Sequence, residues 1–283
     1  MLEGFVRRGD VFFPAGSVDS DDAYRAIWNQ EADDDAVYSA TGVVSQGRED
    51  FATLTATRQR LWTEFPRRHL GTVLEIGCGY GRVPMILSKD RGVTCDRYVG
   101  VDIAAAMLTR FARYRREFGV FADAEVQLVC ASAEEVPLAA DSVDVAISSG
   151  VFLHMGKQFV HRTFAHLAKV LRPGGSIVFD TSFPNARSFG MLPVQLYGLF
   201  APPKPNRVKH WSRRELDALM RDSGLAAKVG AFTIEPTVFK VLPARFRKRE
   251  LPLVDRLNRR LDPPPRLLED LVGTMYSIHS RVS

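Results

Sequence analysis

A glycine-rich turn after a short apolar stretch is the first feature of the sequence that can do chemistry. Residues 73–82 read VLEIGCGYGR, so Gly77, Gly79 and Gly81 follow directly on Val73–Ile76. Glycines let the backbone turn sharply and approach a bound molecule closely, because they have no Cβ atom. A turn of this kind at the end of a strand is typical of a cofactor site, and the charge of that cofactor is the open question.

The spacing of the glycines and a nearby acidic residue indicate whether the cofactor is anionic or cationic. A dinucleotide site has the pattern G-x-G-x-x-G, whereas here the third glycine comes one position early and Arg82 stands where that glycine should be. Glu75 lies two residues before the first glycine, where its carboxylate would repel a pyrophosphate. The same carboxylate suits a ligand with an ammonium and a sulfonium group, such as S-adenosylmethionine (SAM).

A second acidic residue, Asp102, ends the next apolar stretch, Tyr98–Val101. An acid at the tip of the second strand can accept hydrogen bonds from both hydroxyl groups of a ribose. Dehydrogenases and methyltransferases share this feature, so Asp102 alone leaves a nucleotide-binding oxidoreductase as an alternative. The same carboxylate can also cap a helix that begins at Ala104.

Short apolar stretches alternate with amphipathic ones from Thr72 onward. The predicted strands are 72–76, 98–101, 126–130, 144–148 and 176–179, and the predicted helices are 83–88, 104–116 and 157–171. Apolar runs that alternate with helices in this way are typical of a parallel sheet covered on both faces. Ser212 and Glu215 have the spacing of a capping box for another helix, which ends at Gly224, and two further strands are expected within 229–242.

Four segments, in this order, resemble the motifs of the class I SAM-dependent methyltransferases. They are VLEIGCGYGR at 73–82, VGVDIAAAMLTRF at 99–111, ASAEEVPLAADSVDVAISSGVFLHM at 131–155 and LRPGGSIVFD at 171–180. The likeness is greatest to small-molecule enzymes of quinone biosynthesis and natural-product methylation. It implies an α/β, Rossmann-like fold with a seven-stranded, mostly parallel sheet and helices on both faces, an N-terminal helical lid and a cap after the fifth strand.

The resemblance also implies which residues contact the cofactor, with S-adenosylhomocysteine (SAH) as its product. The methionine end would contact Glu75, Gly77, Cys78 and Gly79, and the ribose would contact Asp102. The adenine would contact Ile103, Ser132 and Ala133. The transferred methyl group would lie next to Ser148, Ser149 and Gly150. The family commonly has aspartate where Ser132 stands. A serine hydroxyl can still make one hydrogen bond to the adenine edge, so adenine binding is expected to survive.

His154 is the candidate catalytic residue. It follows the fourth predicted strand in GVFLHM, on the reactive side of the sheet, where an imidazole can accept a proton from a hydroxyl group. A packing role, or a contact with the cofactor, is the alternative. His161 and His166 lie five residues apart and on different faces of the following helix, so no metal site is expected from them.

The chain is expected to divide into three parts. Residues 1–70 form the N-terminal helical segment or lid, 71–242 the SAM-binding core and 243–283 a basic C-terminal helical extension. Within the core, 184–210 is the cap insertion, which would face a hydrophobic acceptor. The apolar wall of this cap would consist of Phe189, Met191, Leu192, Val194, Leu196, Tyr197, Leu199 and Phe200.

Composition and charge bound the class of protein. Of the 283 residues, 46% are hydrophobic and 25% charged, as in a soluble globular protein, and no apolar run is long enough for a membrane-spanning helix. Cys78, Cys95 and Cys130 form no CxxC pair, which argues against a disulfide scaffold or a zinc cluster and favours a cytoplasmic location. The net charge is +5, but residues 10–50 are strongly acidic and 204–260 strongly basic.

Nucleic acid is not an expected partner. The stretch Asp144–Ser149 lacks the prolines typical of enzymes that methylate exocyclic amines of bases, and no basic run is interleaved with aromatic residues. The basic stretch RFRKRE at 245–250 and the apolar cap together allow contact with a membrane surface, and a solvated face is the simpler alternative for the basic residues. A monomer or a homodimer is expected.

We therefore expect a SAM-dependent methyltransferase that acts on a small, hydrophobic acceptor, with O-methylation of a natural product or secondary metabolite as its reaction. N- or C-methylation of a quinone or lipid-linked acceptor at a membrane surface is the alternative within this class. A nucleotide-binding oxidoreductase and a catalytically silent SAM-binding protein are the alternatives outside it.

Overall fold

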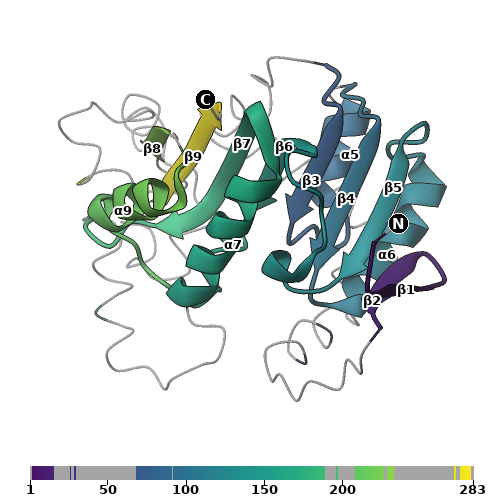
Figure 1. Ribbon diagram of the computed structural model, residues 1–283, viewed down its shortest axis with the longest axis horizontal. Coiled ribbons are helices and arrows are strands. Elements are labelled where there is room, and N and C mark those ends of the chain that lie inside the picture. Colours follow the sequence, from purple (N-terminus) through teal and green to yellow (C-terminus); the bar gives the residue numbers. More distant parts are fainter. Residues whose placement is uncertain are drawn as a thin grey trace, which may run out of the picture.

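The computed structural model describes residues 2–15, 26, 29, 68–90, 92–188, 196, 208–225, 228–232, 271 and 275–281. These residues build one sheet with the strand order β1-β2-β5-β4-β3-β6-β7-β9-β8 (Figure 1). Its strands are β1 (Phe5–Arg8), β2 (Val11–Pro14), β3 (Thr72–Ile76), β4 (Arg97–Asp102), β5 (Glu125–Cys130), β6 (Val143–Ser149), β7 (Leu171–Pro184), β8 (Lys228–Phe232) and β9 (Met275–Arg281). The helices that connect them are α5 (Arg82–Met85), α6 (Ala105–Phe118), α7 (Lys157–Val170) and α9 (Arg213–Ser223).

The centre of the sheet consists of the five predicted strands, β3 to β7, which all run parallel. The chain moves from β3 to one side through β4 and β5, then returns to the other side of β3 with β6 and β7. In sheets of this kind, ligands bind beyond the carboxyl ends of the strands where the strand order reverses. The fold therefore points to the carboxyl ends of β3, β4 and β6.

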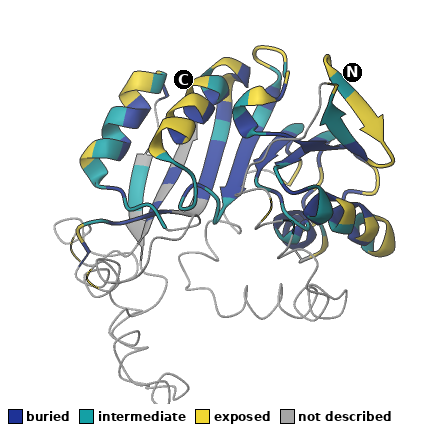
Figure 2. Ribbon diagram, turned by 90° about the horizontal axis from the view of Figure 1, so that it is seen from below, coloured by how far each residue is buried: buried dark blue, intermediate teal, exposed yellow. Residues whose placement is uncertain are grey.

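Helices cover both faces of this sheet, as predicted. Successive residues of a strand face opposite sides, so Val73 and Leu74 of β3 lie in two separate hydrophobic clusters. The cluster of Val73 contains α5 and α6, and the cluster of Leu74 contains α7 and α9. Figure 2 shows the buried strands between these two helical layers. The α/β, Rossmann-like fold is confirmed.

The predicted helices are present, with one change near the glycine-rich turn. α6 and α7 occupy the expected stretches, and at α9 the Glu215 N–H donates to Ser212 Oγ at 3.3 Å while the Ser212 N–H donates to Glu215 Oε2 at 2.8 Å. The helix expected over 83–88 begins as the short α5, with Pro84 in its first turn, and continues as a π-helical turn, Ile86–Asp90.

Residues 275–281 differ from the helical extension expected over 243–283, of which most of 243–274 lies outside the described residues. Met275–Arg281 forms β9, which runs antiparallel between β7 and β8 inside the sheet. Its Tyr276 and Ile278 are fully buried, because the strand alternates apolar residues towards the core. Of the two strands expected within 229–242, one is present as β8, and 233–242 lie outside the described residues.

The first residues of the chain form strands, although they belong to the segment 1–70 that was expected to be a helical segment or lid. Residues 5–14 form a hairpin, β1 and β2, that turns at Gly9 and adds to the edge of the sheet by parallel pairing of Val11 with Leu128 of β5. Most of the remaining segment up to residue 67 lies outside the described residues.

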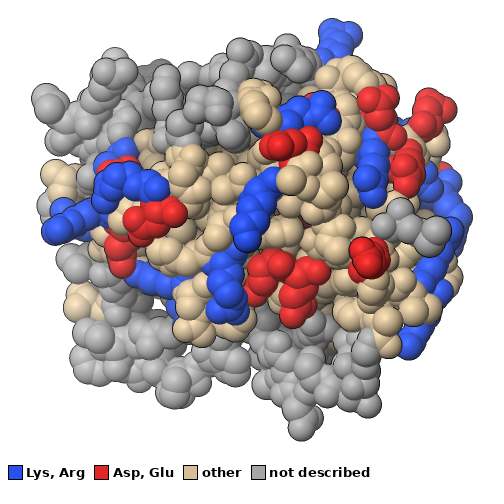
Figure 3. Space-filling model, viewed as in Figure 1, with Lys and Arg blue, Asp and Glu red and all other residues tan. Residues whose placement is uncertain are grey.

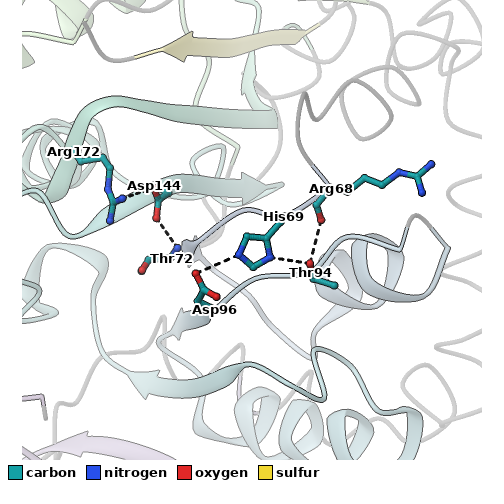
Figure 4. Close-up of polar contacts among 7 residues, drawn as sticks. All are labelled: Arg68, His69, Thr72, Thr94, Asp96, Asp144 and Arg172. Atoms are coloured by element: carbon teal, nitrogen blue, oxygen red, sulfur yellow. Dashed lines mark hydrogen bonds and ion pairs between the residues drawn. The ribbon is translucent and has the colours of Figure 1, made fainter.

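An ionic clamp ties the amino ends of the central strands together (Figure 4). Asp144 of β6 accepts the backbone N–H of Thr72 of β3 at 2.7 Å and pairs with Arg172 of β7 at 2.7 Å. Gly71 makes this approach possible, since a Cβ atom at that position would lie 2.3 Å from Asp144 Oδ2. Three neighbouring strands are thus joined by one carboxylate.

A second, more exposed contact lies at the same end of the sheet (Figure 4). His69 Nδ1 is 2.9 Å from Thr94 Oγ1, and His69 Nε2 is 3.3 Å from Asp96 Oδ2. The side chains of His69 and Asp96 are 56% and 75% exposed. Water therefore competes for this contact, unlike the clamp at Asp144.

Charges on the surface are mixed rather than segregated on the face shown in Figure 3, where Lys and Arg lie beside Asp and Glu. Ion pairs on the described surface include Lys157 with Glu215 and Arg162 with Glu134. The basic stretch 204–260 falls largely outside the described residues. Among those that are described, no helix is both long enough and apolar enough to cross a membrane.

Candidate active site

Three strand ends bring the predicted cofactor residues to one edge of the sheet. The glycine loop follows β3, Asp102 ends β4 and Ser149 ends β6. Ile76, the last residue of β3, is aligned with Val101 on one side and with Ser148 on the other. Because all three strands are parallel, their carboxyl ends meet at this edge.

The glycine loop is held against β4 by its backbone. The N–H groups of Gly77 and Cys78 donate to the carbonyl oxygen of Val101 at 2.7 and 3.0 Å. Gly77 has a φ of +66°, and a Cβ atom there would lie 2.2 Å from Val151 Cγ2. Gly79 has a φ of +51°, but nothing lies within 4 Å of the position that its Cβ would take. The loop is thus closely packed at Gly77 and open at Gly79.

Asp102 connects the glycine loop to the start of α6. Its Oδ2 accepts the Gly79 N–H at 2.9 Å, and its Oδ1 accepts the Ala104 N–H at 2.8 Å. Burial raises the pKa of this carboxyl group, while the backbone N–H groups of Ala104, Gly79 and Ile103 lower it in part. The helix-capping contact expected for Asp102 is present.

The other acidic residue, Glu75, is almost fully buried in β3, with 2% of its surface exposed. Its Oε2 accepts a hydrogen bond from the hydroxyl group of Tyr98 at 2.6 Å. Cys78 is also buried, and burial, followed by the nearby carboxylates of Asp102 and Glu75, raises the pKa of its thiol well above the ordinary value. The thiol therefore stays protonated at neutral pH and is not a nucleophile.

The residues expected around the adenine lie on two adjacent segments. The Ala131 N–H donates to the carbonyl oxygen of Asp102 at 3.1 Å, and the Cys130 thiol donates to that of Ile103 at 3.6 Å. Ser132 is partly exposed, and its N–H donates to Glu135 Oε2 at 3.2 Å. The two segments thus place Ile103 close to Ser132, and Ala133, next in the chain, begins a short 3₁₀ helix.

The residues at the end of β6 differ in how far they are buried. Ser148 is fully buried and donates to the carbonyl oxygen of Ile76 at 3.0 Å, so its hydroxyl group holds two strands together. Ser149 is partly exposed, and Gly150, with a φ of +74°, has open space at its Cβ position. Ser148 therefore has a structural role, in contrast to the expectation that it would face the methyl group.

His154 lies on a turn directly after these residues. Its N–H donates to the carbonyl oxygen of Val151 at 2.9 Å, and the neighbouring Leu153 carbonyl accepts the Lys209 N–H at 2.7 Å. The side chain of His154 is half-buried. The turn is therefore fixed at both ends, against the glycine loop through Val151 and against the segment before α9 through Leu153.

Two residues of this edge were not found from the sequence. Asn29, from the N-terminal segment, accepts the Ala106 N–H in the first turn of α6 at 3.2 Å. Tyr98 is the buried partner of Glu75, and its only signal is a hydroxyl group within an apolar strand. Of the expected apolar wall, Leu196 is described and is 50% exposed, and the other members lie outside the described residues.

Among the described residues, no three His, Cys, Asp or Glu side chains are grouped so that they could hold a metal ion. The strand order also differs from that of a dinucleotide-binding fold, in which a sixth parallel strand follows the fifth. Here the neighbour of β7 is the antiparallel β9. This difference argues against the oxidoreductase alternative.

Comparison with known proteins also points to a methyltransferase. A methyltransferase domain model matches residues 74–179. Dimethylglycine N-methyltransferase of Parasynechococcus marenigrum is 26% identical over 69% of this chain and 67% of its own length. Malonyl-[acyl-carrier protein] O-methyltransferase of Paenibacillus sp. is 33% identical over 40% of this chain, and the match spans only 39% of that relative.

Solved structures show the same fold. Geranyl diphosphate C-methyltransferase of Streptomyces coelicolor, solved with Mg²⁺, geranyl diphosphate and SAH, superposes with a TM-score of 0.56. The two chains are 16% identical, and the match covers 91% of this chain and 96% of that one. The domain match over residues 74–179, the relatives and the strand order together make this chain similar to the class I SAM-dependent methyltransferases.

Proposed function

We propose that the chain transfers the methyl group of SAM to a small, hydrophobic acceptor, and that the acceptor atom is a hydroxyl oxygen. The observation that carries the proposal is the position of His154, on a turn that follows the carboxyl end of β6 and lies against the glycine loop through Val151 and Gly77. An imidazole at this place can remove the proton of an acceptor hydroxyl group.

The residues of the edge fit SAM in charge and in space. The position above Gly79 is open, and carboxylates stand on both sides of the loop, at Glu75 and Asp102. We assign the ammonium and sulfonium end to Glu75 and the glycine loop, including Cys78, and the ribose hydroxyls to Asp102. The adenine contacts are assigned to Ile103, Ser132 and Ala133, and the contact next to the methyl group to Ser149. When bound, SAM supplies an electrophilic methyl group.

The protein contributes alignment and exclusion of water, on which much of the rate of a methyl transfer depends. The contact of Asn29 with the N-terminus of α6 supports an N-terminal segment that reaches this edge as a lid. The half-exposed Leu196 supports an apolar cap, and hence a hydrophobic acceptor. The proteins that this chain resembles are named for transfer to nitrogen, to oxygen and to carbon, so the test below offers more than one acceptor atom.

Transfer from radiolabelled SAM to a panel of hydrophobic phenols, matched amines and DNA tests the proposal. We expect label in the phenols, and we expect His154→Gln to lower kcat by about 10²- to 10⁴-fold, the usual contribution of a general base. The affinity for SAH, measured by calorimetry, should not change in this variant. His161→Gln, on the exposed face of α7, is the matched control and should retain full activity.

Asp102→Ala tests the cofactor assignment independently of the acceptor. It should weaken SAH binding by about 1–3 kcal/mol, because hydrogen bonds to a buried charged group are lost. Label in the amines alone would contradict transfer to oxygen. SAH binding without label in any acceptor class would favour a catalytically silent SAM-binding protein.

A further inference from the structure

Glu75 accepts a hydrogen bond from Tyr98, a residue that has no assigned role in the cofactor site. Tyr98, in β4, is 1% exposed, and its hydroxyl group donates to Glu75 Oε2 at 2.6 Å. A buried carboxylate is costly unless hydrogen bonds stabilise its charge. A hydrogen bond to a charged acceptor at this distance is among the stronger ones in proteins.

The fold makes a specific space for this tyrosine. Tyr98 and Gly100 lie two residues apart in β4 and face the same side of the sheet, and Gly100 is aligned with Glu75 in β3. A Cβ atom on Gly100 would lie 2.8 Å from Tyr98 Cε1 and 2.9 Å from Cys78 Sγ. Gly100 does not have a positive φ, so the backbone conformation does not require glycine here. Glycine is required because any side chain would collide with Tyr98 and Cys78.

The tyrosine ring is also fixed laterally. Phe111 packs edge-on against it with 5.8 Å between the ring centroids, and Phe121 packs at 5.5 Å with a tilt of 37°. Burial, and then the charge of Glu75, raises the pKa of the Tyr98 hydroxyl well above the ordinary value. The hydroxyl group therefore remains a donor, aimed at one carboxylate oxygen.

We propose that Tyr98 is a positioning residue of the cofactor site, which fixes the Glu75 carboxylate so that it meets the cationic amino-acid end of SAM. The proposal rests on the role assigned above to Glu75. Tyr98 does not itself touch the cofactor in this account. Its hydrogen bond holds one oxygen of the Glu75 carboxylate in place before the ligand binds, which lowers the ordering cost of binding.

Two ligands separate this role from a purely structural one. SAH carries the amino-acid end, whereas 5′-methylthioadenosine keeps the adenosine and lacks that end. We expect Tyr98→Phe to weaken SAH binding about tenfold or more, the loss of one hydrogen bond to a charged group, and to leave the affinity for 5′-methylthioadenosine within about twofold. Titration calorimetry of the full chain gives both dissociation constants.

The matched control is Tyr114→Phe. Tyr114 is also fully buried, but it lies on α6, where its hydroxyl group is 3.3 Å from Arg113. Removing this hydroxyl group should change neither dissociation constant. If Tyr98→Phe does not fold, Gly100→Ala is the second variant: it keeps the hydroxyl group but displaces the ring, and should weaken SAH selectively.

Glu75→Gln distinguishes failure of this inference from failure of the assignment on which it rests. If Glu75→Gln affects both ligands equally, the assignment of Glu75 to the amino-acid end is wrong, and the inference falls with it. If Glu75→Gln is selective for SAH but Tyr98→Phe is not, only the role of Tyr98 is overturned. If both are selective, the double variant should lose little more than Glu75→Gln alone, because the two residues act as a unit.

Discussion

The two ends of the central strands use similar residues for opposite purposes. At the amino ends, Asp144 accepts a backbone N–H from Thr72 and pairs with Arg172, so the carboxylate is neutralised within the fold. At the carboxyl ends, Asp102 accepts two backbone N–H groups and has a raised pKa, because burial works against its charge. The Asp144 carboxylate is thus paired within the protein, whereas the Asp102 carboxylate is bonded to backbone N–H groups and has no described ion pair.

Glycines show the same difference. At the amino end, Gly71 lets the clamp at Asp144 close. At the carboxyl end, Val151 occupies the space that a Cβ atom of Gly77 would take, while the corresponding space at Gly79 and Gly150 is open. Stability is thus concentrated at the end without chemistry, as is common when an active site carries unpaired charge and open backbone.

The largest effect is expected from Gly77→Ala. The new methyl group would overlap Val151 and hold an L-residue at positive φ, which together should lower the free energy of unfolding by about 2–5 kcal/mol and weaken SAH binding. Gly79→Ala is the matched control and should cost only about 1–2 kcal/mol, since its Cβ position is open. Urea unfolding measures both, and equal losses would contradict the packing argument.

Asp144→Ala should separate stability from binding. It leaves the Thr72 N–H and the Arg172 guanidinium without this carboxylate, so we expect a loss of about 1.5–3 kcal/mol in the free energy of unfolding and no change in the affinity for SAH. Arg172→Ala should cost less than about 1 kcal/mol, because Arg172 is 44% exposed. A weakened SAH affinity in Asp144→Ala would show that the two ends are coupled.

A smaller effect, in the protein without ligand, is expected from the titration of Asp102. Its pKa is raised from 3.8 in the folded state, so the folded form binds its proton more tightly than the unfolded form. This contribution to stability is present below pH 3.8 and is lost as the pH rises through the raised pKa. Relative to Asp102→Asn, the unmodified protein should lose stability as the pH rises through this window. Parallel curves of unfolding free energy against pH would contradict the raised pKa.

The smallest effect is expected at the exposed contact of the amino end. Asp96→Asn should change the free energy of unfolding by less than about 0.5 kcal/mol, since exposed ion pairs contribute little. Thermal unfolding of Asp96→Asn and of the unmodified protein at a single pH would measure it. A loss above about 1 kcal/mol would mean that this contact belongs to the clamp at Asp144.

Much of the fold could be predicted from the sequence, because strands buried on both faces are apolar runs. Val73–Ile76 and Tyr98–Val101 show this, and both lie in the centre of the sheet. The hairpin at Phe5–Pro14 was missed, although Gly9-Asp10 is a recognised two-residue turn signal, because its first strand reads FVRR and is mostly exposed. The place of the strand Met275–Arg281 beside β7 depends on tertiary pairing that no local pattern records.

The site was predictable in its outline. Motif order brought Glu75, Asp102 and His154 to one edge, while their contacts with SAM and an acceptor stay predictions. The bond between Tyr98 and Glu75 joins residues on different strands and follows from the pairing register, not from local sequence. The buried role of Ser148 likewise depends on which face of β6 it occupies.

The position of β9 has a consequence for the order of events during synthesis. β8 joins the sheet by antiparallel pairing with β9, and β9 separates it from β7. A ribosome adds about 5–20 residues per second, so the cofactor-binding strands are complete seconds before the strand that covers β7. During that interval the nascent chain presents the open backbone edge of β7, and this edge is the place where a chaperone would protect the chain or aggregation would begin.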